Sequence, residues 1–238
     1  MKLWHCYNSR SLRVLWALEE MGWERGADYE VETIPFPPRA LHKEFLDINP
    51  LGTVPYFVDR DGDRDGGGAV AMTESTAICL YLVEKYGKAE FGLAKDHPEY
   101  GDYLNWLFQS DATLTFPTAI ALRYSAMEPP ERRQPQVVQD YAKWFLGRLR
   151  RMDHHMETRD YLCAGRFTIA DIAVGYALHL GEVVGLGEHY TPQVMAYLKR
   201  LQARDTFRRA QAVDPEFDPF KNYTPNFTVE PREPREPK

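Results

Sequence analysis

The sequence predicts an α/β N-terminal domain followed by an all-helical C-terminal domain. Strand and helix patterns alternate over residues 1–87, a polar linker is expected at 88–96, and only helical patterns follow over 97–212. The chain has 238 residues, of which 44% are hydrophobic and 27% charged, so it can bury a sizeable core in one large domain or two small ones.

The N-terminal domain is expected to have the element order βαβαββα, which is about the size of a thioredoxin-like unit. Apolar residues that recur every three or four positions predict the helices, and alternation of polar and apolar residues predicts strands. Prolines end the second strand, and a glycine-rich turn at 61–68 predicts a hairpin. The expected elements are a strand at 3–7, a helix from Leu12, a strand at 29–34, a helix at 39–48, strands at 55–58 and 69–72, and a helix from Thr73 onwards.

The C-terminal domain is expected to consist of long helical segments separated by breaks that contain proline. They cover residues 98–126, 133–158, 169–184 and 191–212. The stretch Phe167-Thr-Ile-Ala-Asp-Ile172 marks the start of one of them, because Thr168 is a good N-cap and Asp171 can reach back to it. Ile169, Ile172, Ala173 and Tyr176 then form a buried stripe. We interpret this stretch as a folding element rather than a catalytic one.

Residues 213–238 form a tail that we expect to be extended and largely disordered. Its last part, Glu230–Pro237, repeats Pro, Arg and Glu without large apolar side chains, a composition that does not bury a core. Aromatic side chains before this stretch are candidates for pinning the tail to the surface of the domain. They are Phe217, Phe220, Tyr223 and Phe227.

Charge and cysteine content exclude several classes of function. The net charge of −6, with no isolated cluster of Lys and Arg, argues against a nucleic-acid partner. No apolar run reaches the length of a signal peptide or of a membrane span, so no membrane association is expected. Cys6, Cys79 and Cys163 are far apart, which argues against a disulfide scaffold and for a reducing compartment, the cytoplasm.

No metal site is expected. The acidic run Asp61–Gly66 imitates the start of a calcium loop, but Met72 stands where such a loop needs Glu, and the flanks are predicted strands. His154 and His155 are adjacent on a predicted helix, so they point in different directions and cannot share a metal. The other histidines are scattered along the chain.

The polar turn Asn8-Ser-Arg-Ser11 lies where the first strand meets the first helix. Hydroxyl groups at this position lie beside the positive end of a helix dipole, where an anion is stabilised. The alternative is that Ser9 or Ser11 caps the helix, which explains most serines so placed. The turn alone therefore leaves chemistry and capping open.

Pro55 opens a predicted strand within Asn49-Pro-Leu-Gly-Thr-Val-Pro-Tyr56. Proline cannot donate to a strand ladder, and here it is a candidate for a cis peptide bond. A cis bond would leave the backbone N–H and C=O of Val54 free to pair with an extended peptide. The alternative is an ordinary proline at the start of a strand.

Glu74 and Ser75 lie at the start of the predicted helix that follows the hairpin. The free N–H groups near Ser75 would bind a carboxylate, and Glu74 would hold an ammonium group. Side by side, these residues suit the free α-amino acid end of a ligand. The commoner alternative is a helix cap with an acidic residue beside it.

Taken together, these segments resemble the glutathione transferase family in their order and spacing. The resemblance extends over nearly the whole chain to about residue 212. It is carried by Asn8-Ser-Arg-Ser-Leu-Arg-Val-Leu-Trp-Ala-Leu-Glu-Glu20, Asn49-Pro-Leu-Gly-Thr-Val-Pro55, Thr73-Glu-Ser-Thr-Ala-Ile78 and Phe167-Thr-Ile-Ala-Asp171. It implies a thioredoxin-like domain that binds glutathione, a helical C-terminal domain and, usually, a homodimer.

The resemblance assigns the family's glutathione contacts to matching positions. Val54-Pro55 would pair with the cysteinyl backbone, and Glu74 with Ser75 would hold the γ-glutamyl end. The glycine carboxylate usually meets a basic side chain of the second helix. Lys43 and His42 are the candidates for this contact, although the local match to the family is poor.

The sequence is similar to the serine-type, theta-like bacterial or fungal classes of the family rather than to the tyrosine or cysteine types. Counting back from Arg13-Val14, Ser9 best matches the catalytic serine, Ser11 is the second choice and Asn8 the third. Tyr7 lies too early to match the family's catalytic tyrosine.

The expected function is therefore a transferase that activates the thiol of glutathione, its co-substrate, without a metal. A serine O–H would donate to the thiolate and so lower the thiol pKa. The thiolate would attack a small hydrophobic electrophile in a pocket bordered by Trp106, Ser110, Thr113 and Phe116. The alternatives are a glutathione-dependent isomerase, lyase or peroxidase, and a non-catalytic glutathione-binding interaction module.

Overall fold

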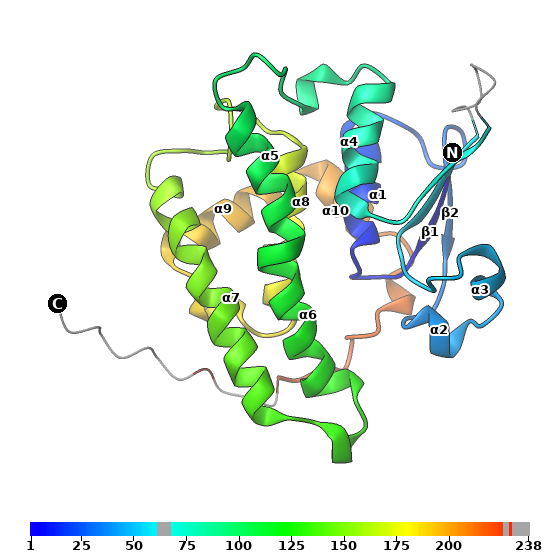
Figure 1. Ribbon diagram of the computed structural model, residues 1–238, viewed down its shortest axis with the longest axis vertical. Helices are drawn as coiled ribbons and strands as arrows, with labels where there is room; N and C mark the ends of the chain where they lie inside the picture. The colour runs from blue at the N-terminus through cyan, green and yellow to red at the C-terminus, as the bar shows by residue number, and fades with distance from the viewer. Residues whose placement is uncertain (61–67, 226–228, 230–238) are drawn as a thin grey trace.

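A computed structural model describes residues 1–60, 68–225 and 229, with an α/β domain beside a helical domain (Figure 1). The α/β domain is built on a four-stranded sheet of order β2-β1-β3-β4. β1 (Lys2–His5) pairs in parallel with β2 (Glu30–Thr33) and antiparallel with β3 (Tyr56–Asp59), which pairs antiparallel with β4 (Val70–Met72). This mixed sheet is that of the predicted thioredoxin-like unit.

Neighbouring side chains along β1 point to opposite faces of the sheet. Leu3 joins the main core with α1 (Ser11–Glu20) and α4 (Ser75–Lys85), which lie between the sheet and the helical domain (Figure 1). On the other face, the ring of Trp4 lies 6.4 Å from the ring of the first residue of α3 (Phe45–Ile48). The sheet is thus covered on both faces.

The single helix predicted over residues 39–48 is wrong, because the structure has two short helices, α2 (Pro38–Leu41) and α3. In one continuous helix, Leu41 and Phe45 would lie on the same face. Phe45 is fully buried, whereas Leu41 is 61% exposed. The helix is interrupted between the two residues, and this break in the helix lets Phe45 reach the core.

The helical domain follows a short 3₁₀ helix, η2 (Ala89–Phe91), in the predicted linker. Its elements are α5 (Tyr100–Gln109), η3 (Ser110–Thr115), α6 (Phe116–Leu122), η4 (Arg123–Met127), η5 (Pro130–Arg132), α7 (Pro135–Met156), α8 (Ile169–Val183), η6 (Gly187–His189), α9 (Pro192–Gln202) and α10 (Asp205–Gln211). Because η3 and η4 are π-helical, helical backbone continues from α5 to the end of η4, close to the predicted segment 98–126. Within the described part of the chain, every helix is too short or too polar to cross a membrane.

α8 lies at the centre of the helical domain, and its residues from Ile169 to Gly181 are all buried. The predicted capping box is confirmed at its start: Thr168 Oγ1 accepts from Ala170 N, and Asp171 Oδ2 accepts from Thr168 N at 2.8 Å. The buried stripe predicted on this helix is confirmed as well. α8 is therefore the buried helix around which the helical domain packs.

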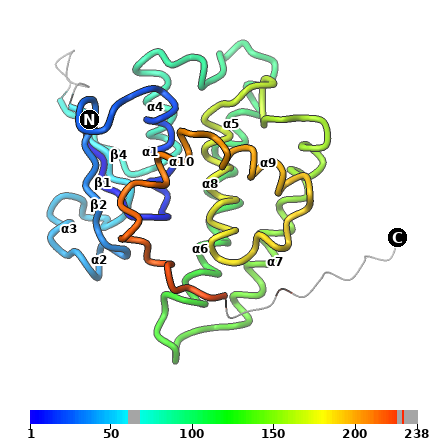
Figure 2. Tube along the Cα trace, turned by 180° about the vertical axis from the view of Figure 1, so that it is seen from behind, coloured from blue at the N-terminus to red at the C-terminus, as the bar shows by residue number. Residues whose placement is uncertain are grey.

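After α10 the chain turns back across the α/β domain (Figure 2). This segment, residues 213–225, contains η7 (Pro215–Phe217) and is tied to β2, where Thr33 Oγ1 donates to Asp214 Oδ2 at 2.6 Å. We call it the C-terminal strap. It brings Asp218 next to the turn between β1 and α1, where it accepts from Asn8 Nδ2.

The strap uses some of the aromatic side chains that the sequence singles out. Phe220 and Tyr223 pack against the main core, whereas Phe217 is 41% exposed. Phe227, the stretch Glu230–Pro237 and the acidic run at 61–67 lie outside the described residues. Residues 213–225, which are also included in the region expected to be largely disordered, have a described structure instead.

Candidate active site

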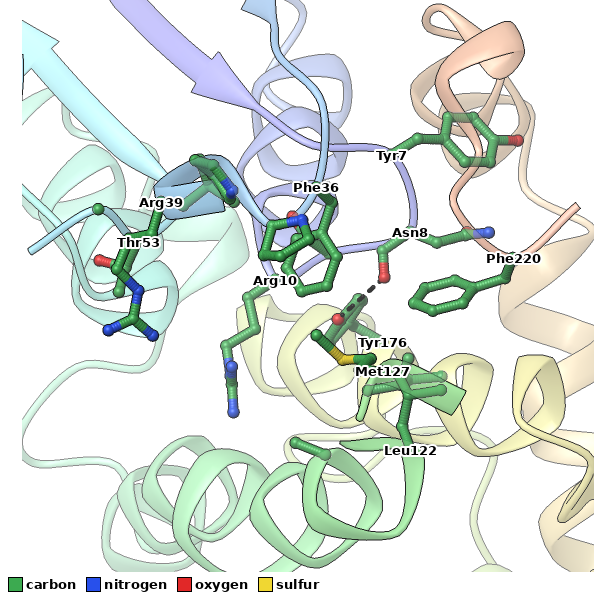
Figure 3. Close-up of a pocket in the computed structure, with 17 residues that line it drawn as sticks. Tyr7, Asn8, Arg10, Phe36, Arg39, Thr53, Leu122, Met127, Tyr176 and Phe220 are labelled. Carbon is green, nitrogen blue, oxygen red and sulfur yellow. Dashed lines mark hydrogen bonds between the residues drawn. The ribbon is translucent and has the colours of Figure 1, made fainter. Parts of the chain in front are cut away.

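A cleft of about 240 Å³ opens between the two domains (Figure 3). Its α/β wall consists of the turn Tyr7–Arg10, the loop Phe36–Arg39 and the segment Gly52–Val54, and Phe220 of the strap closes one side. The helical domain supplies the opposite wall, which is largely apolar. Its residues are Ala119, Leu122, Met127, Tyr176 and Leu180.

Ser9 is the serine of the turn that reaches the cleft. It lines the cleft and is partly exposed, whereas Ser11 is fully buried. The two Oγ atoms lie 2.7 Å apart, and Ser11 Oγ lies 2.7 Å from His5 Nδ1. Ser11 is therefore held behind the cleft wall, where a ligand in the cleft does not reach it.

Ser9 also caps the start of α1. Its Oγ accepts the backbone N–H of Ser11 at 3.3 Å, and its carbonyl accepts the backbone N–H of Leu12 at 3.0 Å. Ser11 Oγ bonds to His5 and Cys6 and does not cap the helix. The capping alternative therefore holds for Ser9, and its place at the cleft leaves its hydrogen available for chemistry as well.

Asn8 fastens the turn to the rest of the molecule. It has a left-handed backbone conformation, φ 55°, which Asn tolerates better than most residues. Its amide Nδ2 donates to Asp218 Oδ1 at 3.2 Å, its Oδ1 accepts from Gln211 Nε2 at 2.8 Å, and its carbonyl accepts from the Tyr176 hydroxyl at 3.2 Å (Figure 3). These contacts hold Asn8 in place in the turn, where it lines the cleft beside Ser9.

The Val54–Pro55 peptide bond is cis, as the sequence predicts, and Val54 lines the cleft. The loop before it is fixed by Asn49, whose Nδ2 donates to the carbonyl of Thr53 at 2.9 Å. Gly52 has φ 58°, and a Cβ there would lie 2.2 Å from Arg39 Cγ. Only glycine therefore lets this loop pack on α2.

Arg10 and Arg39 are the cationic side chains among the described residues that line the cleft. Arg39 lies on α2 beside Thr53, and Arg10 extends from the turn into the space between the domains (Figure 3). His42 and Lys43, the predicted basic residues, lie in the break after α2 and do not line the cleft. Because α2 ends at Leu41, Arg39 is the basic residue of this helix that lines the cleft.

Glu74 and Ser75 lie at the start of α4 as predicted, but neither lines the described cleft. Glu74 is exposed, whereas Ser75 is buried and its Oγ accepts from Arg13 Nη1 at 3.0 Å. One side chain is thus in solvent and the other is held inside the protein.

A buried guanidinium that the sequence analysis did not single out lies behind this helix start. Arg13 is fully buried, and its Nη1 lies 2.5 Å from Asp111 Oδ1. It also donates to Thr115 Oγ1 and to the carbonyl of Ala173, each at 3.0 Å. Burial raises the pKa of Asp111, but the charge and hydrogen bond of Arg13 outweigh this and hold the pKa below its usual value. Arg10 Nε, at 3.4 Å from the same carboxylate, links this cluster to the cleft.

The residues predicted to border an electrophile pocket do not line this cleft. Trp106 and Ser110 are fully buried in the helical core, and Thr113 and Phe116 are not among the lining residues. The helical backbone reaches the cleft only further along, in α6 and η4. A π-helical segment such as η3 changes the angular position of every later residue, which regular helical spacing does not reveal.

Phe220 is the part of the cleft that the sequence pattern identifies least well. Its ring lies 6.4 Å from the ring of Phe36, on the other wall. The signal was its place as an aromatic residue in a mostly polar tail, which predicts pinning to the surface but not its location.

The cysteines do not supply a reactive thiol. Cys6, Cys79 and Cys163 are all free and buried, and burial raises the pKa of each thiol to about 12. A thiol that reacts in this cleft therefore has to belong to a ligand.

Comparison with known proteins identifies the family. The family model "Glutathione S-transferase, N-terminal domain" matches residues 9–85, and "Glutathione S-transferase, C-terminal domain" matches residues 116–205. The chain belongs to the glutathione S-transferase family. Relatives within this family include a glutathione S-transferase domain-containing protein of Dictyostelium discoideum, 26% identical over 87% of this chain and 78% of that protein. Glutathione S-transferase 1 of Schizosaccharomyces pombe is 28% identical over 72% of this chain and 71% of that protein.

Solved structures of glutathione S-transferases have the same fold. The glutathione transferase Ure2p5 of Phanerochaete chrysosporium superimposes with a TM-score of 0.74 at 24% identity, over 90% of this chain and 94% of that one. BphK, a bacterial glutathione S-transferase, gives 0.71 at 20% identity over 89% and 98%. In the described part of this chain, no group of three or more His, Cys, Asp or Glu side chains is placed to hold a metal ion.

Proposed function

We propose that the protein is a glutathione transferase in which the Ser9 hydroxyl stabilises the thiolate of bound glutathione. The observation that carries this proposal is that Ser9 lines the same cleft as Val54, whose bond to Pro55 is cis. In this arrangement the cysteinyl backbone of glutathione pairs with Val54 and its sulfur meets Ser9. A structural neighbour, Ure2p5, was cocrystallised with the glutathione conjugate 1-(S-glutathionyl)-2,4-dinitrobenzene, which supports this class of reaction.

The chemistry follows from the ionisation of the thiol. A free thiol with a pKa of about 8.5 is only about 3% thiolate at pH 7. A hydroxyl that donates to the sulfur, aided by the positive end of α1, favours the charged form. Lowering the pKa by about two units takes about 2.7 kcal/mol and makes more than half of the bound glutathione thiolate. The thiolate then forms a carbon–sulfur bond with the electrophile. An aryl halide loses its halide ion in this step, whereas an enone gives up a carbon–carbon π bond, or an epoxide a carbon–oxygen bond, and the product takes up a proton from solvent.

The apolar helical wall indicates the kind of electrophile. Leu122, Met127 and Leu180 face the cleft together with the rings of Phe36 and Phe220. Apolar substrates are bound by removing such surface from water. We assign a small hydrophobic electrophile to this wall, in place of the pocket bordered by the residues of α5 and η3.

The two ends of glutathione are assigned to different places. The glycine carboxylate meets Arg39, which lines the cleft. The γ-glutamyl end reaches past the described cleft to the start of α4, where it meets the Glu74 carboxylate and the free backbone N–H groups at Ser75. The protein would act in the cytoplasm as a homodimer of the serine type, as is usual in its family.

Turnover assays and binding measurements test this function. Purified protein is offered glutathione with an aryl halide, an enone, an epoxide and a hydroperoxide, and glutathione binding is followed by calorimetry. We expect conjugation of at least one carbon electrophile, and a fall of about tenfold or more in kcat/KM in Ser9→Ala. The glutathione Kd at pH 7 should rise only about fourfold, the part of the affinity that comes from the lowered thiol pKa.

Other outcomes assign another function. Binding of glutathione without turnover of any compound indicates a binding module, and turnover of the hydroperoxide alone indicates a peroxidase. An absence of glutathione binding contradicts the proposal.

A further inference from the structure

Two buried side chains stand in line behind Ser9. Ser9 Oγ lies 2.7 Å from Ser11 Oγ, which lies 2.7 Å from His5 Nδ1. Ser11 is fully buried and His5 is 1% exposed, so water does not compete for these contacts. Each polar atom in such a line has a fixed number of hydrogens and lone pairs, and the possible directions of the hydrogens can therefore be worked out.

His5 starts the line as a neutral donor. Burial lowers the pKa of His5 to about 4, against the opposing effect of Asp214 on the strap, so the ring is uncharged at neutral pH. Its Nε2 is buried and has no hydrogen-bond partner among the described residues. An unpaired buried N–H is less favourable than an unpaired lone pair, so the proton belongs on Nδ1, which faces Ser11.

The direction of the hydrogen bond from His5 determines the direction of the next one, between Ser11 and Ser9. Its Oγ accepts from His5 Nδ1 and from the backbone N–H of Cys6 at 3.3 Å, which fills both of its lone pairs. Its own hydrogen has two possible acceptors, Ser9 Oγ at 2.7 Å and the carbonyl of Cys6 at 3.3 Å. The shorter distance is the usual one for O–H···O, so Ser11 donates to Ser9.

Ser9 is left with one role. Its Oγ accepts the hydroxyl of Ser11 at 2.7 Å and the backbone N–H of Ser11 at 3.3 Å, and these contacts fill its acceptor capacity. The Ser9 hydrogen is then free for the cleft that Ser9 lines. We propose that His5 and Ser11 are positioning residues that point the Ser9 hydrogen at the sulfur of glutathione. This inference rests on the proposed function, in which Ser9 donates to that sulfur.

The direction of the hydrogen bonds in this line decides whether Ser9 stabilises the thiolate. With the proton of His5 on Nε2, Ser11 would donate to Nδ1, and Ser9 would donate inward to Ser11. The lone pairs of Ser9 would then face the thiolate and repel it. The same side chains in the same places would disfavour the thiolate.

We call the hydrogen-bonded line from His5 through Ser11 to Ser9 the relay, and the pKa of the bound glutathione thiol tests it. This pKa is measured from the ultraviolet absorbance of the thiolate as a function of pH. The variants are Ser9→Ala, Ser11→Ala and the matched pair His5→Asn and His5→Leu. Asparagine keeps an amide N–H near the position of Nδ1, whereas leucine has a similar shape without it. Thr118→Val is the control, because it removes a buried hydroxyl that donates to the Leu114 carbonyl outside the cleft. Binding of S-methylglutathione and the melting temperature monitor the site and the fold.

We expect the thiol pKa to rise by about one unit in Ser11→Ala and in His5→Leu, with S-methylglutathione binding unchanged. His5→Asn and Thr118→Val should stay near the wild-type value. Ser9→Ala should show the largest rise. If His5→Leu does not fold, the thiol pKa values of Ser11→Ala and His5→Asn decide whether the relay lowers the thiol pKa.

Failure of the relay and failure of the proposed function give different results. A higher thiol pKa in Ser9→Ala, with Ser11→Ala and His5→Leu like wild type, overturns the relay and leaves the function of Ser9 in place. Equal values for His5→Asn and His5→Leu remove His5 from the relay. An unchanged thiol pKa in Ser9→Ala overturns the proposed function itself.

Discussion

Arg39 shows how the place of one residue in a short helix decides whether its charge meets the cleft. The resemblance to the family implies a basic residue of the second helix at the glycine carboxylate, and His42 and Lys43 are its candidates in the sequence. α2 ends at Leu41, so these two residues lie in the break, and Arg39 lines the cleft. Gly52 packs directly on the stem of Arg39, which holds its head near the cleft rim.

Replacing Arg39 by Met should therefore weaken glutathione binding. Arg39 is exposed, so we expect a loss of about 1 kcal/mol, or about fivefold in Kd, together with a weaker dependence of binding on salt. Calorimetry at low and high salt measures both. Lys43→Met is the matched control, and an equal or larger loss in that variant would restore the original assignment.

At the scale of elements, the C-terminal strap completes a cleft that two other segments begin. Asn8 at one end of the chain donates to Asp218 near the other end, and Phe220 lies over the loop of Phe36. The strap thereby adds an apolar side to a cleft between the α/β and helical walls. It should affect ligands that fill the apolar half more than glutathione alone.

Phe220→Ala should weaken binding of an S-alkyl glutathione about fivefold while leaving glutathione binding within about twofold. The reason is the loss of one apolar contact between the Phe220 ring and the alkyl group, worth about 1 kcal/mol. Competition assays with both ligands measure the difference. Phe217→Ala serves as control, since Phe217 is 41% exposed and does not line the cleft. Equal losses for the two ligands would speak against this role of the strap.

Arg13 joins α1 to η3 and to α8 through buried contacts. Replacing it by Met removes a donor from the Asp111 carboxylate, Ser75 and Thr115, and leaves Asp111 with Arg10 Nε at 3.4 Å and Thr76 Oγ1 at 3.1 Å. We expect a loss of about 3 kcal/mol in the free energy of unfolding, because a partly buried carboxylate loses its shortest ion pair. Urea unfolding measures it. Combining Arg13→Met with Asp111→Leu should recover part of the loss, and the account of this cluster would be wrong if the double variant were as unstable as the sum of the single ones.

At the scale of the whole molecule, two buried histidines make stability depend on pH. Burial lowers the pKa of His5 and of His179 to about 4. In the unfolded chain the pKa of histidine is about 6.5, so the unfolded state takes up protons first as the pH falls. Their contribution to stability is therefore complete above about pH 6.5 and is lost as the pH falls toward 4.

The free energy of unfolding should fall by about 2 kcal/mol for each of these histidines between pH 7 and pH 5. Urea unfolding at a series of pH values measures the decline. His179→Gln, which keeps hydrogen-bonding groups without the titration, should lessen the decline by about 2 kcal/mol. Burial raises the pKa of Asp171 to about 6, which opposes the decline equally in both proteins. A wild-type stability that stays level over this range, or a variant with the same slope, would contradict the assigned neutral state.

The sequence was informative where structure is local. The capping box at Thr168, the cis bond before Pro55 and the order of strands and helices each depend on residues close together in the chain. The site was less predictable because its parts come together over long distances. The contact of Asn8 with Asp218 joins residues 210 positions apart, and the π-helical η3 shifts the face that α6 presents. Composition and spacing carry little information about either.

The measurement that most directly tests the account is the pKa of the cysteinyl thiol of glutathione bound to wild type and to Ser9→Ala. Glutathione labelled with ¹³C at the cysteinyl β-carbon allows the thiol to be titrated by its chemical shift. We predict a pKa about two units below the free value of about 8.5 in wild type, and a return most of the way to it in Ser9→Ala. A thiol that titrates near its free value in both proteins would contradict the central claim that Ser9 stabilises the thiolate.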